Sequence, residues 1–299
     1  MMKLHPRKTL SALALSLALG FSAMPWAMAA AMAAESALVK GETLSLGYDI
    51  YVGGLHALAA TVDVTQDGPR YRATAAGQTK GLINFLFAWT SRVKVTGQRH
   101  EDGYRPQRYL SASRWRGKAR ARRLDFFGGG AYRLERMPPR KTASKRQPLP
   151  PEMIRHTVDP LTAGLKAIEH LVRAGSCGGT IRVFDGKRRY DIALADEGGD
   201  VVEPSRLSIF QGPARRCRFT MDRIHGFKKR RYTNFWNDSE DNGQGMWDFE
   251  VWIARPKPGV PPVPVRFEGE IHHGSVMIHL THAAVKPSGI DAAILANPR

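Results

Sequence analysis

A row of five cations at every second position is the feature of this sequence that most directly suggests chemistry. Within the stretch ASRWRGKARARRLDF, positive side chains stand at Arg114, Arg116, Lys118, Arg120 and Arg122. On a β-strand, alternate side chains project from one face about 6.6 Å apart, so we expect all five to point the same way. Like charges in line repel one another unless acids or a bound polyanion lie opposite. The sequence must therefore be examined for acids that could lie opposite this row or for an anionic group that it could bind.

The first residues have the pattern of a secretory signal peptide. Lys3, Arg7 and Lys8 precede an apolar run at residues 10–19, and small-residue AMA sequences follow it. The apolar run is short for a membrane span, which needs about 20 residues. We therefore expect residues 1–34 to be removed and the mature chain to be exported, with no transmembrane span.

Three interpretations of the cationic row stay open. It can be the solvated outer face of a sheet, a surface for anionic lipid headgroups or lipopolysaccharide phosphates, or a nucleic-acid contact. Cations in line can follow nucleic-acid phosphates, but an exported protein does not meet them, so we expect no nucleic-acid partner. The row lies in a basic segment, residues 105–146, with fourteen Lys or Arg and two acids in a chain of net charge +18. The basicity is thus largely local.

A second segment, GLINFLFAW at residues 81–89, is apolar on every side whether it is helical or extended. Such a segment must be buried or must contact an apolar partner. Core packing is one interpretation. The other is an apolar lining over an acyl-chain pocket, formed by Leu82, Phe85, Phe87 and Trp89. A cationic face beside an apolar lining suits an amphiphile with an anionic head.

No pattern in the sequence identifies a catalytic or metal site. The motifs GxSxG, HExxH, Walker A and the dinucleotide fingerprint do not occur. Residues 236–245 resemble a calcium loop but lack its closing glutamate. His272 and His273 are adjacent on an expected strand and so point to opposite faces. We predict no catalytic residue, no metal and no cofactor, and leave enzymatic activity open.

The chain has two cysteines, Cys177 and Cys217. In an oxidising compartment the simplest expectation is a structural disulfide between them. The chain-entropy model predicts a stabilisation of about 4 kcal/mol for a loop of this length.

Period-two alternation predicts that most of the chain is β-sheet. Short alternating segments recur with turn signals such as Gly53-Gly54 and Asp185-Gly186 between them. One helix is expected at residues 160–174, with Asp159 as its cap and Gly175 as its stop. We predict a mainly β fold, a curved antiparallel sheet or incomplete β-barrel with one packed amphipathic helix. It forms a single domain at residues 35–287, with a possible linker at 137–153 and a tail at 288–299.

Four segments together resemble a known family. They are DPLTAGL, a cysteine just ahead of VFDGKRRYDI, then RRCRFTMDRIHGF, and finally PVPVRFEGEIHHGSVMIHL. This order resembles the exported bacterial proteins catalogued as domain of unknown function 3108, over residues 41–283. The resemblance implies a β-rich periplasmic or envelope-associated protein with the helix packed on its sheet. It implies no activity and no catalytic residue.

These observations lead to two functional hypotheses. The first is a non-enzymatic periplasmic protein that binds an amphiphilic or polyanionic envelope component, such as an anionic lipid or lipopolysaccharide. The alternative is a structural or protein-interaction factor whose basic face docks an acidic protein partner.

Overall fold

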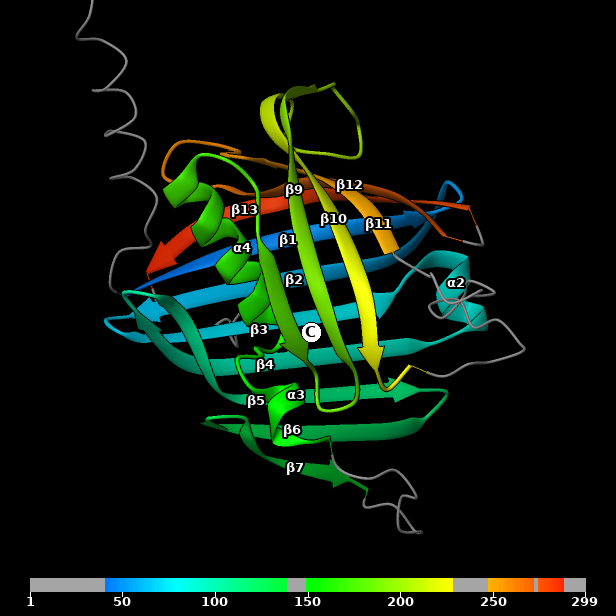
Figure 1. The fold of residues 1–299 in the computed structure, drawn as a ribbon. Helices are drawn as coiled ribbons and strands as arrows, with labels where there is room; N and C mark the ends of the chain where they lie inside the picture. The colour runs from blue at the N-terminus through cyan, green and yellow to red at the C-terminus, as the bar shows by residue number, and fades with distance from the viewer. Residues whose placement is uncertain (1–40, 139–148, 228–246, 272–273, 288–299) are drawn as a thin grey trace, which may run out of the picture. The chain divides into compact units, whose positions relative to one another are not determined.

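Thirteen strands make up most of the computed structural model, which describes residues 41–138, 149–227, 247–271 and 274–287 (Figure 1). The described strands are β1 (Glu42–Val52), β2 (Leu55–Asp67), β3 (Arg70–Thr79), β4 (Trp89–His100), β5 (Gly103–Trp115), β6 (Lys118–Gly128), β7 (Ala131–Met137), β8 (Thr180–Phe184), β9 (Arg189–Val202), β10 (Gly212–His225), β11 (Trp247–Ala254), β12 (Val263–Ile271) and β13 (Gly274–Pro287). No helix in these described ranges is long and apolar enough to cross a membrane.

All thirteen strands belong to one antiparallel sheet. Their order is β7-β6-β5-β4-β3-β2-β1-β13-β12-β11-β10-β9-β8, so the first and last strands of the chain pair at its centre. β7 and β8 are the two edges and do not pair with each other, so the sheet is not closed. The predicted fold class, a curved sheet or incomplete barrel, is confirmed.

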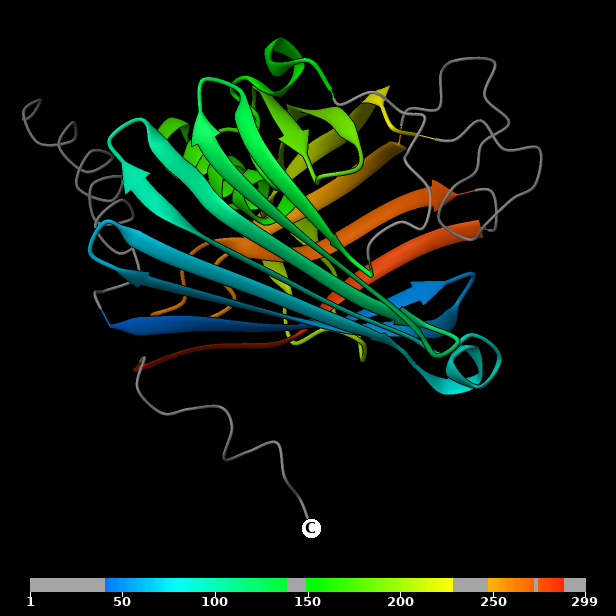
Figure 2. The same ribbon diagram turned by 90° about the horizontal axis from the view of Figure 1, so that it is seen from below.

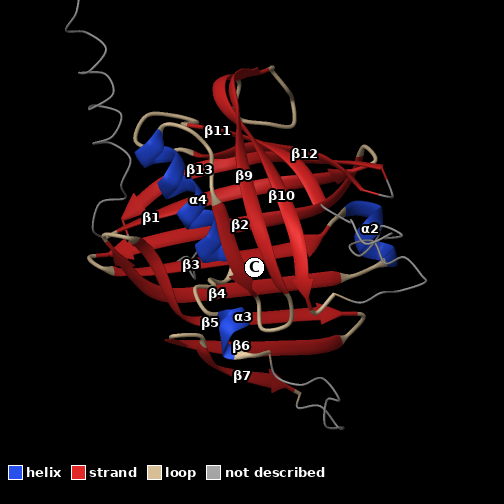
Figure 3. Ribbon diagram, in the orientation of Figure 1, coloured by secondary structure: helices blue, strands red, loops and turns tan. Residues whose placement is uncertain are grey.

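The main helix, α4 (Pro160–Ala174), lies against one face of this sheet (Figures 1 and 3). It begins as predicted, because the Asp159 carboxylate accepts hydrogen bonds from the backbone N–H groups of Leu161 and Thr162. It ends where Gly175 adopts φ 69°, a left-handed conformation that favours glycine. α4 contacts both β5 and β8, strands at opposite sides of the sheet. The sheet therefore curves around the helix.

Two shorter helices complete the described structure, α2 (Gly81–Leu86) and α3 (Pro151–Ile154). α3 begins inside the possible linker predicted at 137–153 and ends one residue beyond it. Its last residue, Ile154, is 2% exposed and packs in the main core. The chain therefore re-enters the core at Ile154, before α4 begins, and the possible linker at 137–153 stays a prediction.

The core follows from the alternation in the strands. In β1, the side chains of Leu44, Leu46, Tyr48 and Ile50 are buried on one face, as their spacing predicts. The Tyr48 hydroxyl donates a hydrogen bond to the carbonyl oxygen of Pro264, which satisfies its polar atom inside the core.

Cys177 and Cys217 form the predicted disulfide, with Cα atoms 5.9 Å apart. It ties the segment between α4 and β8 to β10. The neighbouring β8–β9 hairpin turns at the predicted place, where the Asp185 carboxylate accepts hydrogen bonds from the N–H groups of Lys187 and Arg188.

Several predictions fall outside the described residues. These are the signal peptide at 1–34, the calcium-like segment 236–245, the pair His272 and His273, and the tail 288–299.

Candidate functional site

The cationic row lies on a hairpin rather than on one strand. β5 ends at Trp115, β6 begins at Lys118, and Arg116 and Gly117 form the turn between them. Both turn residues have positive φ, 45° and 75°, the backbone that a tight two-residue hairpin requires. The prediction of one strand with five cations on one face is therefore wrong. Gly117 indicates this turn in the sequence, but the regular spacing of the cations on either side of it suggests one continuous strand.

The turn distributes the cations over both faces of the sheet. Lys118 pairs with Trp115 across the hairpin, Arg120 with Ser113, and Arg122 with Ser111. Residues 118, 120 and 122 are on the same face of β6 as Leu124, which is buried. The three cations therefore lie on the core side of the sheet. Arg114 pairs with Ala119 and lies on the opposite face. We name the five residues from the predicted row the cationic hairpin.

Within the described ranges, no member of the cationic hairpin forms an ion pair. The nearest acid along the chain, Asp125, is already bound: its carboxylate lies 2.7 Å from Arg108 Nε and 2.9 Å from Arg123 Nε. Burial alone would raise the pKa of Asp125, but hydrogen bonds from Arg108 and the charges of both arginines outweigh it and lower that pKa. Asp125 thus neutralises other arginines.

The apolar segment 81–89 lies mostly on the surface. Leu82 is 68% exposed, Phe85 85% and Phe87 45%, whereas Trp89 is partly buried against the Val52 and Leu58 cluster. Core packing is therefore wrong for the first three residues. A role for Leu82, Phe85, Phe87 and Trp89 as a pocket lining stays a prediction.

The exposed apolar side chains adjoin the cationic hairpin. The guanidinium carbon of Arg116 lies 5.6 Å from the centroid of the Phe87 ring, and the Arg116 N–H donates to the Ala88 carbonyl. Trp115, 46% exposed, pairs with Trp89 across β5 and β4. We name the exposed group the apolar tip; its members are Leu82, Phe85, Leu86, Phe87 and Trp115. The sequence patterns identify the cations and the apolar segment 81–89 separately but do not include Trp115 with either.

A groove of about 800 Å³ crosses β2–β7 on the face away from the core. Its lining includes a row of directly paired residues, among them Ala76, Arg92, Ala112 and Ala121. Small side chains leave the space, and Arg92 and Arg114 border it. No residue of the predicted apolar lining borders this groove.

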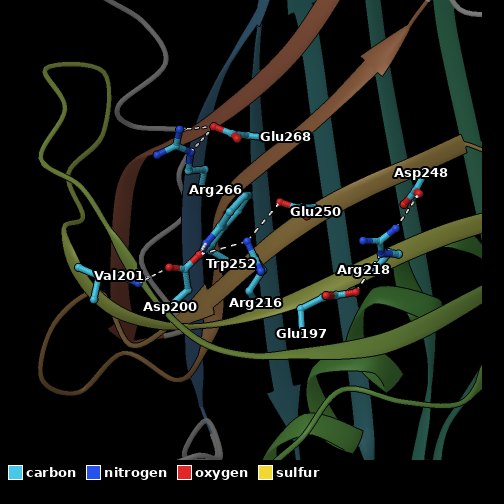
Figure 4. A network of polar contacts seen from close by, with 10 residues as sticks. All are labelled: Glu197, Asp200, Val201, Arg216, Arg218, Asp248, Glu250, Trp252, Arg266 and Glu268. Carbon is cyan, nitrogen blue, oxygen red and sulfur yellow. Dashed lines mark hydrogen bonds and ion pairs between the residues drawn. The ribbon is translucent and has the colours of Figure 1, made fainter.

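A different arrangement of charge occupies the surface of β9–β12 (Figure 4). We name it the polar network. Trp252 Nε1 donates to Asp200 at 2.9 Å, and the Arg266 guanidinium carbon lies 5.4 Å from the Trp252 ring. Arg216 reaches Asp200 and Glu250, at 3.7 and 3.9 Å. The remaining contacts join Arg218 to Glu197 and Asp248, and Arg266 to Glu268.

The carboxyl group of Asp159 is buried at the start of α4. Asp159 is fully buried, and its carboxylate accepts a hydrogen bond from the Thr162 hydroxyl at 2.5 Å. The same hydroxyl lies 2.6 Å from the Tyr71 hydroxyl. Burial raises the pKa of Asp159 to about 6, although its hydrogen bonds oppose the shift. This cluster begins α4 and holds it to β3.

The described residues contain no group of three or more His, Cys, Asp or Glu placed to hold a metal ion. The charges of the polar network pair with one another, whereas the cations of the cationic hairpin form no ion pair within the described ranges, and all of them except Arg122 are exposed.

The fold and this surface define a class: an open, barrel-like antiparallel β-sheet curved around one helix. A family model described as "Protein of unknown function (DUF3108)" matches residues 47–281, so the chain belongs to that family. This confirms the resemblance drawn from the four sequence segments. Among proteins with curated descriptions, none matches the chain.

Two solved structures are similar in fold. The crystal structure of a beta-barrel-like protein of domain of unknown function DUF1849 from Brucella abortus has a TM-score of 0.50 and 10% identity, covering 83% of this chain and 100% of that one. A "putative lipoprotein" from Parabacteroides distasonis has a TM-score of 0.33 and 9% identity, covering 84% and 98%. At 10% identity the first likeness shows a similar fold and nothing more. The TM-score of 0.33 is too low for the second to support a conclusion.

Proposed function

We propose that this protein is an exported, non-enzymatic envelope protein that binds an anionic amphiphile or polyanionic envelope component through the cationic hairpin. The observation that carries the proposal is the lack of ion-pair partners for the hairpin cations within the described ranges, beside exposed apolar side chains. Export to the periplasm is supported by the signal-peptide pattern at residues 1–34 and by the paired cysteines.

The physical argument is one of unsatisfied charge. Clustered cations raise the energy of the isolated surface, and an anionic ligand removes that cost while gaining attraction. Near an anionic membrane surface, each Lys or Arg contributes about 1 kcal/mol to binding. Several such residues on one hairpin therefore supply useful affinity without a deep pocket.

The test compares two pairs of charge-neutralising substitutions. Arg114→Gln with Arg120→Gln removes two cations from the hairpin, and Arg216→Gln with Arg218→Gln removes two from the polar network. Both double variants have the same net charge. Sedimentation with phosphatidylcholine vesicles that contain phosphatidylglycerol measures affinity. We expect the hairpin pair to lower it roughly 30-fold, and the network pair to leave it within about twofold.

Native mass spectrometry of protein purified from a periplasm provides the complementary measurement. A bound lipid or lipopolysaccharide fragment that is lost in the hairpin variant supports the proposal. If wild-type protein carries no ligand and does not sediment with anionic vesicles, the proposal is wrong. The alternative, docking of an acidic protein partner through the same basic face, then becomes the hypothesis to pursue.

A further inference from the structure

Helix α2 presents its apolar face to the solvent. Leu82, Phe85 and Leu86 occupy positions i, i+3 and i+4, so they share one side of the helix, and they are 68%, 85% and 52% exposed. Ile83 lies on the other side and packs against the cluster that contains Leu58. A surface helix normally turns its apolar face to the core. The inverted orientation of α2 marks a contact surface.

The structure holds α2 firmly in this orientation. The Lys80 N–H donates to the Ala57 carbonyl at 2.9 Å, which fixes the start of the helix to β2. The Thr79 hydroxyl bonds the Asn84 side chain at 2.9 Å and accepts from the Trp89 N–H at 3.0 Å. The exposed side chains are therefore displayed by a fixed support.

The two ends of strands β1–β7 differ in composition. Neighbouring strands are antiparallel, so their connections alternate between a first end, with residues 53–54, 80–88 and 116–117, and a second end. The first-end connections contain no acid, whereas the β4–β5 turn at the second end carries Glu101 and Asp102. Leu55 and Met137, 58% and 57% exposed, also lie at the first end. Figure 2 shows α2 beside the hairpin tips at this end.

We propose that the apolar tip inserts into the headgroup and outer acyl region of an anionic lipid bilayer, with the cationic hairpin on the lipid phosphates. The inference rests on the proposed function and names its partner as a membrane surface. Exposed Leu and Phe surrounded by Lys, Arg and Trp is the composition of interfacial membrane anchors. The tip also protrudes from the sheet end and does not border the groove, so it is shaped to enter a bilayer rather than to enclose one acyl chain.

The test uses vesicles of phosphatidylcholine and phosphatidylglycerol at high salt, where the attraction of exposed charges is screened and apolar insertion remains. Phe85→Ser is the tip variant. Phe127→Ser is the matched control, because Phe127 is 60% exposed at the second end and lies 5.6 Å from the Arg133 guanidinium carbon. We expect Phe85→Ser to weaken salt-resistant binding at least about tenfold. Phe127→Ser and the conservative Phe85→Trp should bind like the wild type.

The outcomes separate the two proposals. If Phe85→Ser and Leu82→Ser bind like the wild type while the Arg114→Gln, Arg120→Gln variant loses binding, insertion is wrong and the proposed function stands. If the wild type does not bind anionic vesicles at any salt concentration, both are wrong. Equal losses in Phe85→Ser and Phe127→Ser would also overturn insertion, because the effect would then be unspecific. Phe85 is 85% exposed, so its substitution leaves the fold intact.

Discussion

The polar network on β9–β12 and the cationic hairpin of β5 and β6 both consist of arginines on surface strands, but they differ in what lies opposite. Arg216, Arg218 and Arg266 each reach a carboxylate on the same or a neighbouring strand. Within the described ranges, Arg114 and Arg120 reach none. Paired charges hold adjacent strands in register, whereas unpaired charges cost free energy without supporting the fold. We therefore expect the polar network to contribute more to the stability of the fold than the cationic hairpin does.

The largest expected effect tests whether stability is concentrated on the network side. The disulfide ties the segment before β8 to β10, next to the polar network. Replacing Cys177 and Cys217 by Ala frees a long loop in the unfolded chain and should lower the free energy of unfolding by about 4 kcal/mol. Urea denaturation measures the loss, and sedimentation with anionic vesicles under native conditions should be unchanged. A loss of vesicle binding by the folded variant would show that the two regions are coupled.

The carboxyl groups of Asp159 and of Asp200 in the polar network should affect the stability of the fold in opposite ways as pH changes. A hydrogen bond from Trp252 is the main cause of the lowered pKa of Asp200, so that group stabilises the fold above its ordinary pKa and loses this contribution as pH falls. Asp159 has the opposite sign, because burial raises its pKa from 3.8 to about 6. Its contribution is fully present below pH 3.8 and is lost as pH rises through about 6.

Asp159→Asn isolates this term, because the amide oxygen still caps α4 but does not titrate. We expect the variant to gain stability relative to the wild type as pH rises from below 3.8 to above 6, by on the order of 3 kcal/mol. Urea denaturation of both proteins at several pH values measures the difference. A difference that stays constant across this range would contradict the raised pKa.

A smaller difference in the free energy of unfolding is expected between substitutions of one tryptophan in each region. Trp252 is 6% exposed and donates to Asp200, whereas Trp115 is 46% exposed in the apolar tip. Trp252→Phe removes the donor and should lower the free energy of unfolding by about 1 kcal/mol. Trp115→Phe should change it by less than about 0.5 kcal/mol. Thermal and urea unfolding measure both, and equal losses would mean that the tip supports the fold as much as the network does.

Local patterns predicted the fold well because they are set by near neighbours in sequence. The cap at Asp159, the stop at Gly175 and the turn at Asp185 each act through backbone groups within a few residues. The alternation in β1 placed its buried face correctly, since one-sided burial and the two-residue period leave one orientation. The family resemblance agreed with this reading.

The candidate site was harder to predict because it depends on residues distant in the chain. The cations of the hairpin occur at every second position, so the sequence resembles one continuous strand. The turn at Arg116 and Gly117, where φ is positive, lies inside this pattern and does not change the spacing of the charges. The polar network joins Asp200, Arg216 and Trp252 across three strands, and strand pairing alone brings them together. The exposure of the α2 side chains could not be predicted either, because an apolar segment does not itself show which of its faces the rest of the chain covers.

The smallest predicted effect tests the comparison most directly. Arg122 lies opposite Arg136 across β6 and β7, so removing positive charge here relieves repulsion. Arg120→Gln with Arg122→Gln should leave stability unchanged or raise it, by up to about 0.5 kcal/mol. Arg216→Gln with Arg218→Gln, equal in charge, should lower it, because carboxylates lose their partners.

Thermal unfolding at low and high salt measures both variants. Salt screens exposed charges, so any gain in the hairpin variant should disappear at high salt. If the hairpin variant is destabilised as much as the network variant, its cations have a structural role. The proposal that they serve ligand binding and not stability is then wrong. A gain confined to low salt would mean that the isolated protein carries a cost at this hairpin, which an anionic partner can remove.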